Sequence, residues 1–557
     1  MTTRRDFTAM MTRRDAVAMM TRRDAVAMMM ATTLAASQIW AAGAWGQGAT
    51  QPRQGGELQF GLDGAAVVTF VLDPHNSGFA PHNRVFRSIF DSLVVLRSDQ
   101  SVGPWLARSW EISADQKSYT FKLRTDVTFH DGTKFDAAAV KTNLDRIKDP
   151  KNALVALPDI GPYTGAEVLA PDTIRVDLAE PFSPLLRNLS KTTLGIVSPA
   201  ALQRYGGTIG QNPVGTGPFR FVSLTQGIEI RLARNPDYAW APPTALHEGP
   251  AYLDSLVFRN VPEESTRVAA LQSRQVHAAD GIPPQNILAL QADHGFRVLQ
   301  KELLNNNYSL YLNVGRAPWN DVDVRRAVQL SLDVNALVKV IYLGTTPRAW
   351  SPLSPSLFAS NDKELTNSWK FDPKQAASLL DAKGWKPGPD GVRVRDGKRL
   401  TITFIDTQGN REKRLDVIQL ARRQLTRSGI ELTIESQPLG TYNDKLTRGE
   451  FDLSGASQFA PDPDVLRRLH LPEGRPAASV SKVDDAEISA WLKQGTREPD
   501  GESRAELYRR VQRKLVELAY AFPIYVLLYT IATTDAVHDL TIDTHGFPEF
   551  HSAWLSA

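Results

Sequence analysis

The sequence predicts a mixed α/β protein, because segments with helical spacing alternate with segments that have the residue alternation of strands. Residues 56–62 and 119–124 alternate apolar and polar side chains, as half-buried strands do. A helical pattern over 411–428 ends at Gly429 and is followed directly by a strand-like run, 430–434. A helix followed at once by a strand is typical of α/β lobes.

Two further helices are predicted from their end signals. Asp321 is a candidate N-cap for a helix over 321–343, and Gly344 is its stop. Pro373 is a first-turn residue that opens another helix, which extends to Gly384. The chain has 557 residues, more than a single hydrophobic core usually holds, so we expect two or three lobes.

Residues 1–46 have the features of an export signal. The phrase MTRRDAVAM occurs twice behind the related MTTRRDFTAM, and the first copy, with Arg4 and Arg5, most resembles a twin-arginine signal. A mildly apolar run over 25–45 follows, too short and too rich in small polar residues to span a bilayer, and small residues near 42–46 offer cleavage sites. We expect export in a folded state; a basic amphipathic helix lying on a membrane is the alternative. Each copy begins with Met, so Met1, Met11 or Met20 can be the start.

Charge and cysteine content narrow the functional classes. The signal holds six Arg and three Asp, so the mature chain is left with 58 basic and 58 acidic side chains and no net charge. A nucleic-acid-binding protein would need a clustered positive face, for which the sequence gives no sign. The chain has no Cys, which excludes disulfides, thiolate metal sites, cysteine nucleophiles and a lipidated N-terminal cysteine. We therefore expect a soluble exported protein.

No catalytic motif is present. The sequence lacks a Gly-x-Ser-x-Gly elbow, a His-Glu-x-x-His helix, a phosphate loop and a dinucleotide fingerprint. The Gly-rich run 213–219 places Pro218, which has no N–H, directly after Gly217, so we expect a structural turn there rather than a phosphate site. The ten histidines are scattered, and Asp462 and Asp464 are flanked by prolines as in a loop. We expect neither a catalytic residue nor a metal site nor a cofactor.

A series of short phrases is spread along the chain from about residue 55 onward. They are LDPH at 72–75, IFDSL at 89–93, PWLARSW at 104–110, YTFKLR at 119–124, VTFHDG at 127–132, NPVGTGPF at 212–219, RNPDY at 234–238, DVRRA at 323–327 and GEFDL at 449–453. In these phrases and in their order the chain resembles the family 5 extracellular solute-binding proteins of ABC importers, which include oligopeptide, dipeptide and nickel-chelate receptors. The phrases at 127–132 and 212–219 are the most specific.

The resemblance implies a two-lobed periplasmic-binding-protein-like fold of type II, with an extra subdomain inserted in the first lobe. We expect the first lobe at 55–98, 216–305 and 520–557, the extra subdomain at 99–215 and the second lobe at 306–519. The hinge is expected near 308–314, with its return near 513–519. A ligand that contacts both lobes only when they are closed would stabilise the closed state, which a membrane permease would recognise.

The resemblance fixes the ligand less well than the fold. Peptide receptors of the family commonly have Gly-Trp and a nearby Asp before an Asp-Pro motif, and that Asp pairs with the peptide's amino terminus. Here the stretch is GASQFAPDPD at 455–464, where the Trp is missing and Gln458 or Phe459 stands at the position of the Asp. Dipeptide binding is thereby put in doubt, because an unpaired buried ammonium group costs several kcal/mol. Nickel-chelate receptors offer Arg, His and Trp, and residues 149–156 supply little of that.

Nine residues are candidates for the interlobe cleft by their position. They are His75, Asn76 and Phe79 on the first lobe, and Asn313, Trp350, Tyr442, Gln458, Phe459 and Asp462 on the second. Aromatic side chains there can enclose a ligand and amides can bond peptide-like groups, although Trp350 and Phe459 can equally be lobe core. The expected function is a periplasmic, monomeric receptor that passes a peptide or similar solute to inner-membrane permease subunits and binds no nucleic acid. A metal-chelate receptor on the same fold is the alternative, followed by an exported hydrolase.

Overall fold

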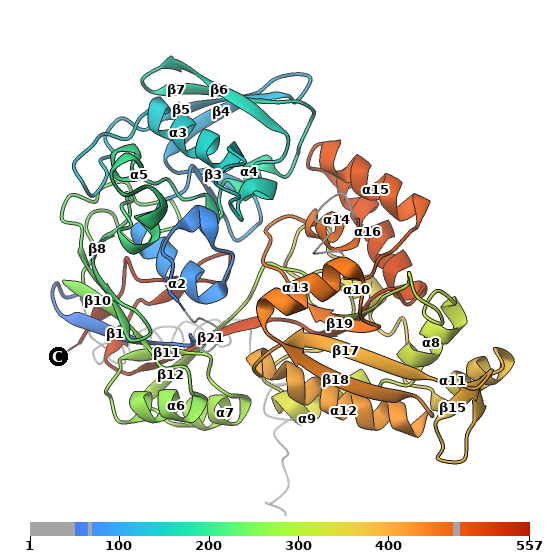
Figure 1. The fold of residues 1–557 in the computed structure, drawn as a ribbon. Helices are drawn as coiled ribbons and strands as arrows, with labels where there is room; N and C mark the ends of the chain where they lie inside the picture. Colours follow the sequence, from blue (N-terminus) through green and yellow to red (C-terminus); the bar gives the residue numbers. More distant parts are fainter. Residues whose placement is uncertain (1–50, 65–68, 472–479, 557) are drawn as a thin grey trace, which may run out of the picture. The chain divides into compact units, whose positions relative to one another are not determined.

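The computed structural model describes residues 51–64, 69–471 and 480–556 (Figure 1). The chain divides into the units Met1–Pro52 and Arg53–Ala557, and the account below concerns the second unit. The predicted export signal at 1–46 lies outside the described residues. Among the residues that are described, no helix combines the length and apolar character needed to cross a bilayer.

The first lobe is built on a seven-stranded sheet. Its strands, in spatial order, are β12 (Phe296–Glu302), β21 (Leu528–Thr534), β11 (Ala278–Asp280), β1 (Glu57–Leu62), β10 (Ser255–Asn260), β9 (Glu229–Arg234) and β8 (Phe219–Thr225). Strand β1 runs parallel to both β10 and β11, and the other pairings are antiparallel. Helix α2 (Ala80–Ile89) packs on one face, and α6 (Glu264–Gln272) and α7 (Pro284–Ala292) cover the other (Figure 1). Consecutive residues of β21, Ile531 and Ala532, belong to the cores on opposite faces, as strand periodicity requires.

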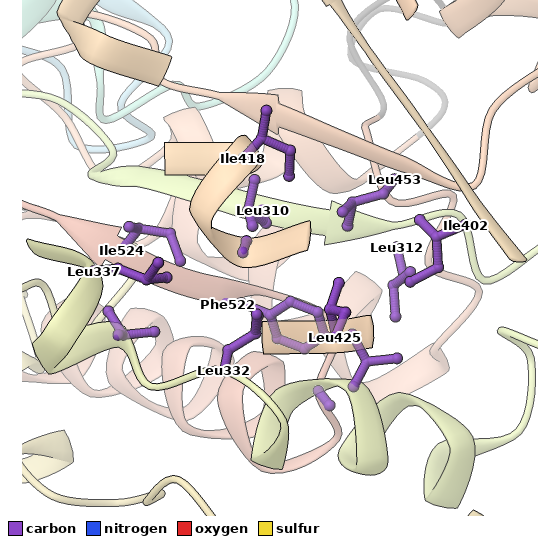
Figure 2. Close-up of a cluster of buried hydrophobic side chains, with 14 of the residues drawn as sticks. Leu310, Leu312, Leu332, Leu337, Ile402, Ile418, Leu425, Leu453, Phe522 and Ile524 are labelled. Atoms are coloured by element: carbon purple, nitrogen blue, oxygen red, sulfur yellow. The ribbon is translucent and has the colours of Figure 1, made fainter. Parts of the chain in front are cut away.

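The second lobe is built on a five-stranded sheet. Its order is β18 (Glu431–Gln437), β17 (Thr401–Thr407), β19 (Leu453–Ala456), β13 (Tyr308–Leu312) and β20 (Phe522–Tyr525). One face is covered by α8 (Val322–Leu330), α9 (Val334–Tyr342), α11 (Pro373–Ala382) and α12 (Arg414–Arg427), and α13 (Leu439–Arg448) packs on the other. Figure 2 shows the main core, in which Leu310, Phe522 and Ile418 are fully buried. A further core forms around α14 (Val465–His470), α15 (Ala486–Arg497) and α16 (Glu502–Glu517).

A four-stranded antiparallel sheet forms a subdomain of its own, which we call the β4–β7 subdomain. Its order is β4 (Ala107–Ile112), β5 (Ser118–Leu123), β7 (Thr173–Leu178) and β6 (Tyr163–Ala170), packed with α3 (Ala137–Lys148) and α4 (Leu185–Asn188). The remaining elements are short: β2 (Val94–Leu96), β3 (Val102–Pro104), α5 (Pro199–Tyr205), α10 (Asp362–Leu365), β14 (Lys386–Pro387), β15 (Arg393–Arg395), β16 (Lys398–Arg399), β22 (Val537–His538), β23 (Thr541–Ile542), β24 (Pro548–Glu549) and β25 (Trp554–Leu555).

The helix predicted over 321–343 is in fact two helices. Asp321 caps α8 as expected, since its side chain accepts the Asp323 amide. The chain then breaks at Ser331, because Asp333 caps α9 by accepting the Ala336 amide, and the Asp333 amide is itself bonded to the side chain of Gln424. A second N-cap inside the apolar pattern therefore divides the predicted helix into α8 and α9.

The Gly-rich run predicted to be a turn packs closely against α2. Added Cβ atoms would lie 2.1 Å from the Ile89 carbonyl oxygen at Gly215 and 2.8 Å from it at Gly217. The Gly217 amide donates to that carbonyl over 2.9 Å. These glycines therefore allow the chain entering β8 to approach the end of α2.

The chain passes between the two large sheets at two places. Residues 303–307 join β12 to β13, and residues 526–527 join β20 to β21. The Leu303 amide donates to the Leu527 carbonyl over 3.0 Å, so the two passages lie side by side. The expected hinge segments, 308–314 and 513–519, do not coincide with these passages. The first begins with β13 and the second lies at the end of α16, because sheet pairing starts directly after the crossing.

Candidate functional site

The carboxyl ends of parallel strands in the first lobe carry acidic side chains. Asp63 follows β1, and Asp280 is the last residue of β11, which is parallel to it. The Asp63 amide donates to Asp280 Oδ1 over 2.7 Å, so the two strand ends are joined. In open α/β sheets, ligands bind outside the carboxyl ends of the strands. This edge is therefore the first place to look for a site.

Arg84 of α2 pairs with this acidic edge. Its Nη1 lies 2.6 Å from Asp280 Oδ2, and its guanidinium carbon lies 5.0 Å from the centre of the Tyr529 ring. The Tyr529 hydroxyl donates to the same Asp280 oxygen over 2.9 Å. Burial raises the pKa of Asp280 above its ordinary value, although Arg84 opposes the shift. Arg84 Nε is buried and has no hydrogen-bond partner among the residues that the structure describes, so a donor is left over at this edge.

The matching edge of the second lobe has a strained turn. Strands β17 and β19 are parallel, so the loop after β17 and residues 457–459 after β19 leave the sheet at the same edge. Glu412 and Lys413, directly before α12, have φ values of 56° and 61°. This left-handed conformation costs a residue other than glycine about 1 kcal/mol or more. Surrounding contacts must therefore hold the turn.

Arg414 provides most of those contacts. Its Nε and Nη2 donate to Glu412 Oε2 over 3.0 and 2.7 Å, and Nη2 also donates to Ser457 Oγ over 2.6 Å. The Tyr525 hydroxyl donates to Glu412 Oε2, and the Tyr342 hydroxyl donates to the Glu412 carbonyl oxygen over 2.6 Å. Partial burial opposes the charged form of Glu412, but Arg414 and Arg411 lower its pKa to about 2. The carboxylate is therefore charged at any physiological pH.

The two strand edges face each other across the lobe boundary. Lys413 Nζ in the second lobe lies 2.5 Å from Glu264 Oε2 at the start of α6 in the first lobe. Tyr308, on the second-lobe side, stacks on Tyr525 with ring centres 4.9 Å apart. The Arg414 guanidinium carbon lies 4.6 Å from the centre of the Tyr308 ring. Its hydroxyl is buried without a hydrogen bond among the described residues. We call the Arg84, Asp280 and Tyr529 group together with the Arg414, Glu412 and Tyr308 group the boundary cluster.

Phe459 is the candidate residue of the second lobe whose ring contacts residues on the other side of this boundary. Its ring centre lies 4.9 Å from that of Phe547 and 5.5 Å from that of His545, both in the C-terminal loop. Lys191 Nζ, in the chain after α4, lies 5.6 Å from the same ring. Gln458, beside it, is held through its backbone, whose amide donates to Asn306 Oδ1 over 2.6 Å. The Gln458 side chain is half-buried.

The first-lobe candidates differ in burial. His75 is buried, with Nε2 3.0 Å from the Gly195 carbonyl oxygen and Nδ1 2.8 Å from Arg146 Nη1. Burial lowers the pKa of His75 to about 4, with Asp73 opposing and Arg146 assisting. Asn76 is exposed, and half-buried Phe79 precedes α2. Both ring nitrogens of His75 are thus already engaged within the lobe.

The other second-lobe candidates have internal partners. Asn313 Nδ2 donates to the carbonyl oxygens of Gly449 and Phe451, and the Tyr442 hydroxyl lies 3.0 Å from Ser454 Oγ. These two residues connect parts of the same lobe.

Trp350 and Asp462 are also occupied. The Arg348 guanidinium carbon lies 3.5 Å from the centre of a Trp350 ring, and Asp462 accepts two hydrogen bonds from Arg504 at 2.7 and 2.9 Å. The nine candidates therefore do not converge, and only Gln458 and Phe459 lie at the parallel strand edge.

Sequence reasoning missed the boundary cluster. Arg414 is the first residue of α12 and follows the loop after β17, and that position was the available signal once the strand was taken as parallel. Among the described residues no group of three or more His, Cys, Asp or Glu side chains could hold a metal. A separate groove of about 490 Å³ lies between the β4–β7 subdomain and the second lobe, lined by residues such as Phe182, Lys493 and Arg497, and none of the nine candidates lines it.

The burial of His75 makes stability depend on pH. Between pH 6.5 and about 4 the unfolded chain takes up a proton that the folded imidazole refuses, so the free energy of unfolding falls as the pH is lowered through this window. We expect His75→Gln to reduce that slope by up to about 1.4 kcal/mol per pH unit. Urea unfolding from pH 4 to 7 measures it, with the exposed His294→Gln as control. An unchanged slope in His75→Gln would contradict the assignment.

Comparison with known proteins places this geometry in a family. The model for the middle region of bacterial extracellular solute-binding proteins of family 5 matches residues 101–472. The glutathione-binding protein GsiB of Escherichia coli K12 is 30% identical over 370 residues, which cover 66% of this chain and 68% of that protein.

Two solved structures extend the likeness. NikA from Brucella suis in complex with Fe(III)-EDTA matches with a TM-score of 0.78 and 25% identity, covering 90% of this chain and 100% of that chain. DppA from Helicobacter pylori in complex with the peptide STSA matches with a TM-score of 0.75 and 26% identity, covering 90% and 98%. The expected type II binding-protein fold is confirmed, and the chain belongs to the family 5 extracellular solute-binding proteins, the substrate-binding components of ABC importers.

Proposed function

We propose that this protein binds a peptide or a similar small organic solute at the boundary cluster, between its two lobes, and delivers it to the permease subunits of an ABC importer. The observation that carries this proposal is the opposition of the two parallel strand edges, with Lys413 of one lobe bonded to Glu264 of the other. A solute held there contacts both lobes only in the closed state and so stabilises closure.

The chemistry of the boundary cluster supports a solute with groups of both signs. Arg84 and Asp280 on one edge, and Arg414 and Glu412 on the other, form matched pairs, so neither edge has a strong net charge. The unpaired Arg84 Nε–H is a donor for a carboxylate or carbonyl oxygen. A peptide carries both kinds of end group together with amides that match such partners.

Phe459 suits a solute that differs from the peptides whose amino terminus pairs with an aspartate in other receptors of the family. Phe459 offers a ring where peptide receptors of the family commonly place a carboxylate, and Phe547 and Lys191 extend that surface. A ring contacts apolar or planar parts of a solute, whereas a carboxylate pairs with an ammonium group. We therefore propose that an ammonium group of the solute, where it has one, pairs with another residue of the boundary cluster.

We propose further that the protein acts as a monomer and binds without turnover. The proposed division into lobes is 55–98, 216–305 and 520–557 against 306–519, with 99–215 as the extra subdomain. Support for binding rather than catalysis comes from the engagement of the candidate acids and bases in internal contacts, such as Asp462 with Arg504 and His75 with Arg146.

A receptor for a nickel or other metal-chelate complex is the second candidate. It is favoured by the likeness to NikA, whose structure holds Fe(III)-EDTA. The described residues provide no metal-binding group of their own, so in this candidate the metal would arrive with its chelator, and affinity would need both together.

Native mass spectrometry of the protein purified from its own periplasm tests which solute is bound. We expect an adduct with the mass of a peptide or similar organic solute. A metal isotope pattern would favour the chelate receptor instead. If the protein is isolated ligand-free, a thermal-shift screen with peptides, chelators and metal–chelator mixtures decides, since a bound solute raises the unfolding temperature. Turnover of any of them, rather than stoichiometric binding, would contradict the proposal.

Substitution of two aromatic residues tests whether the solute binds at the boundary cluster or in the lobe interior. We expect Phe459→Ala to weaken binding of the identified solute by about tenfold or more, because it removes a second-lobe ring that contacts Phe547 and Lys191 across the boundary. Trp350→Ala is the matched control and is expected to change the dissociation constant little, since Arg348 covers that ring. Isothermal titration calorimetry measures both. Equal losses in the two variants would place the site elsewhere.

We propose that residues 1–46 direct the protein to the periplasm through the twin-arginine route. The support is the Arg4 and Arg5 pair followed by an apolar run and small residues. We expect the exported protein to begin near Gln47, and replacement of every Arg-Arg pair in residues 1–46 by Lys-Lys to keep the precursor inside the cell. N-terminal sequencing and fractionation measure these outcomes. An exported protein that retains Arg4 would contradict the signal.

A further inference from the structure

The β4–β7 subdomain contacts the second lobe through polar groups that are separate from the boundary cluster. The Ser183 amide donates to the Thr496 carbonyl oxygen over 2.8 Å, and Ser183 Oγ donates to the Glu498 carbonyl oxygen over 2.6 Å. Glu180 and Arg497 form an ion pair beside them. That pair is more than half exposed on the Arg497 side, so it contributes little by itself.

Arg187 is the buried centre of this contact. It belongs to α4 of the subdomain, and its side chain is 7% exposed. Its Nε lies 3.0 Å from Asp500 Oδ2 and 3.9 Å from Asp462 Oδ2, both in the second lobe. Its guanidinium carbon lies 4.8 Å from the centre of the Phe358 ring, which is also in the second lobe. Its Nη1 donates to the Gln100 carbonyl oxygen over 2.9 Å, so the guanidinium also has a partner outside the second lobe and joins the two parts.

The second lobe offers this site an unbalanced charge. Asp462 and Asp500 share one internal guanidinium, because Arg504 donates to both Asp462 oxygens and, through Nη1, to Asp500 Oδ1 over 2.6 Å. Asp462 and Arg504 are 2% and 0% exposed. Two carboxylates and one guanidinium group have a net charge of one negative, which Arg187 neutralises. Water or a counter-ion must take that role when Arg187 withdraws.

A reciprocal contact lies nearby. Asp159 of the subdomain accepts hydrogen bonds from Lys191 Nζ over 2.5 Å and from Arg468 Nη1 over 3.1 Å, and Arg468 belongs to α14 of the second lobe. Each part of the protein thus presents a carboxylate to a guanidinium of the other. The arrangement fixes the relative position of the two surfaces, since shifting one separates both pairs at once.

A groove that is open to solvent lies beside this contact. It has a volume of about 490 Å³ and lies between residues 157–162 and 180–182 of the subdomain and the second-lobe residues Arg467, Lys493, Thr496 and Arg497. Polar contacts between parts of one chain resemble transient protein interfaces, at which relative motion is expected.

We propose that Arg187 is a latch that holds the β4–β7 subdomain against the second lobe in the absence of any ligand. Part of the free energy of closure is then supplied by the chain itself, and the solute at the boundary cluster supplies the rest. Because apparent affinity scales with the fraction of molecules that are competent to bind, the latch sets affinity without touching the solute. This inference rests on the proposed function for its meaning in transport, whereas its test uses the ligand-free protein.

The absence of cysteine from the chain permits a direct distance measurement. Leu169→Cys in the subdomain and Leu439→Cys in the second lobe replace exposed side chains and accept nitroxide labels. Val222→Cys and Leu246→Cys, both exposed and both outside the contact, form the control pair. Pulsed electron paramagnetic resonance on the purified, ligand-free protein then reports the distribution of distances across the contact.

We expect Arg187→Gln and Asp500→Asn each to reduce the short-distance population at least ~3-fold, while the control pair stays unchanged. Arg187→Lys keeps the positive charge and is expected to retain most of that population. Arg175→Gln is the matched control, because Arg175 pairs at 2.7 and 3.0 Å with Glu167 and Asp177 of its own sheet. It should leave the distances unchanged.

Two outcomes would overturn the latch. One is an unchanged distance distribution in Arg187→Gln and Asp500→Asn, and the other is the same loss in Arg175→Gln. If Arg187→Gln does not fold, Asp500→Asn decides alone, because the Asp500 carboxylate is 42% exposed and Arg187 keeps Asp462, at 3.9 Å, as an ion-pair partner. Failure of solute binding would leave these ligand-free distances as they are, so the proposed function and the latch are tested separately.

Discussion

The double passage of the chain between its two large sheets is the constraint on which the rest of the structure depends. The passages at 303–307 and 526–527 are hydrogen-bonded to each other through Leu303 and Leu527, and on either side the same two stretches of chain continue as paired strands, β12 with β21 and β13 with β20. The lobes are therefore joined by one two-stranded connection. Such a connection restrains sliding more than bending, because bending changes only a few backbone dihedrals at the crossing.

Given that connection, the position of the proposed site follows from strand direction. In the first lobe β1 and β11 are parallel, and in the second lobe β17 and β19 are parallel, so each lobe has one edge at which strands end and helices begin. Asp63 and Asp280 occupy one edge, and Glu412 and Arg414 occupy the other. Their charges are already paired within each lobe. A solute at the proposed site would therefore gain from replacing water and from bonding to donors such as Arg84 Nε, and would not meet a bare charge, which would be costly to keep buried when the site is empty.

The sequence was sufficient for the fold and insufficient for most of the site, for a physical reason. Local patterns determine helices and strands. The cap at Asp321 and the first-turn proline Pro373 are therefore where they were predicted, although a second cap at Asp333 divides a helix that the apolar spacing had made continuous. A site, in contrast, depends on which strand lies beside which. Trp350 is a reasonable candidate by residue type, yet Arg348, two positions earlier, lies over its ring. No feature of the neighbouring sequence distinguishes Arg414 from the other arginines of α12. Only the parallel pairing of β17 with β19 brings Arg414 to the edge of the second-lobe sheet where these strands end.

The separation between the boundary cluster and the contact around Arg187 has a consequence for how cargo can change. In our proposal Phe459 touches the solute, so a replacement there would alter the binding free energy of the solute. The ion pairs of Arg187 with Asp500 and Asp462 join the subdomain to the second lobe, and in the proposal they touch no solute atom. A chain with that division could have Phe459 in place of an aspartate at the boundary and still close in the same geometry. NikA in complex with Fe(III)-EDTA and DppA in complex with a peptide both match the backbone of this chain, which agrees with such a division.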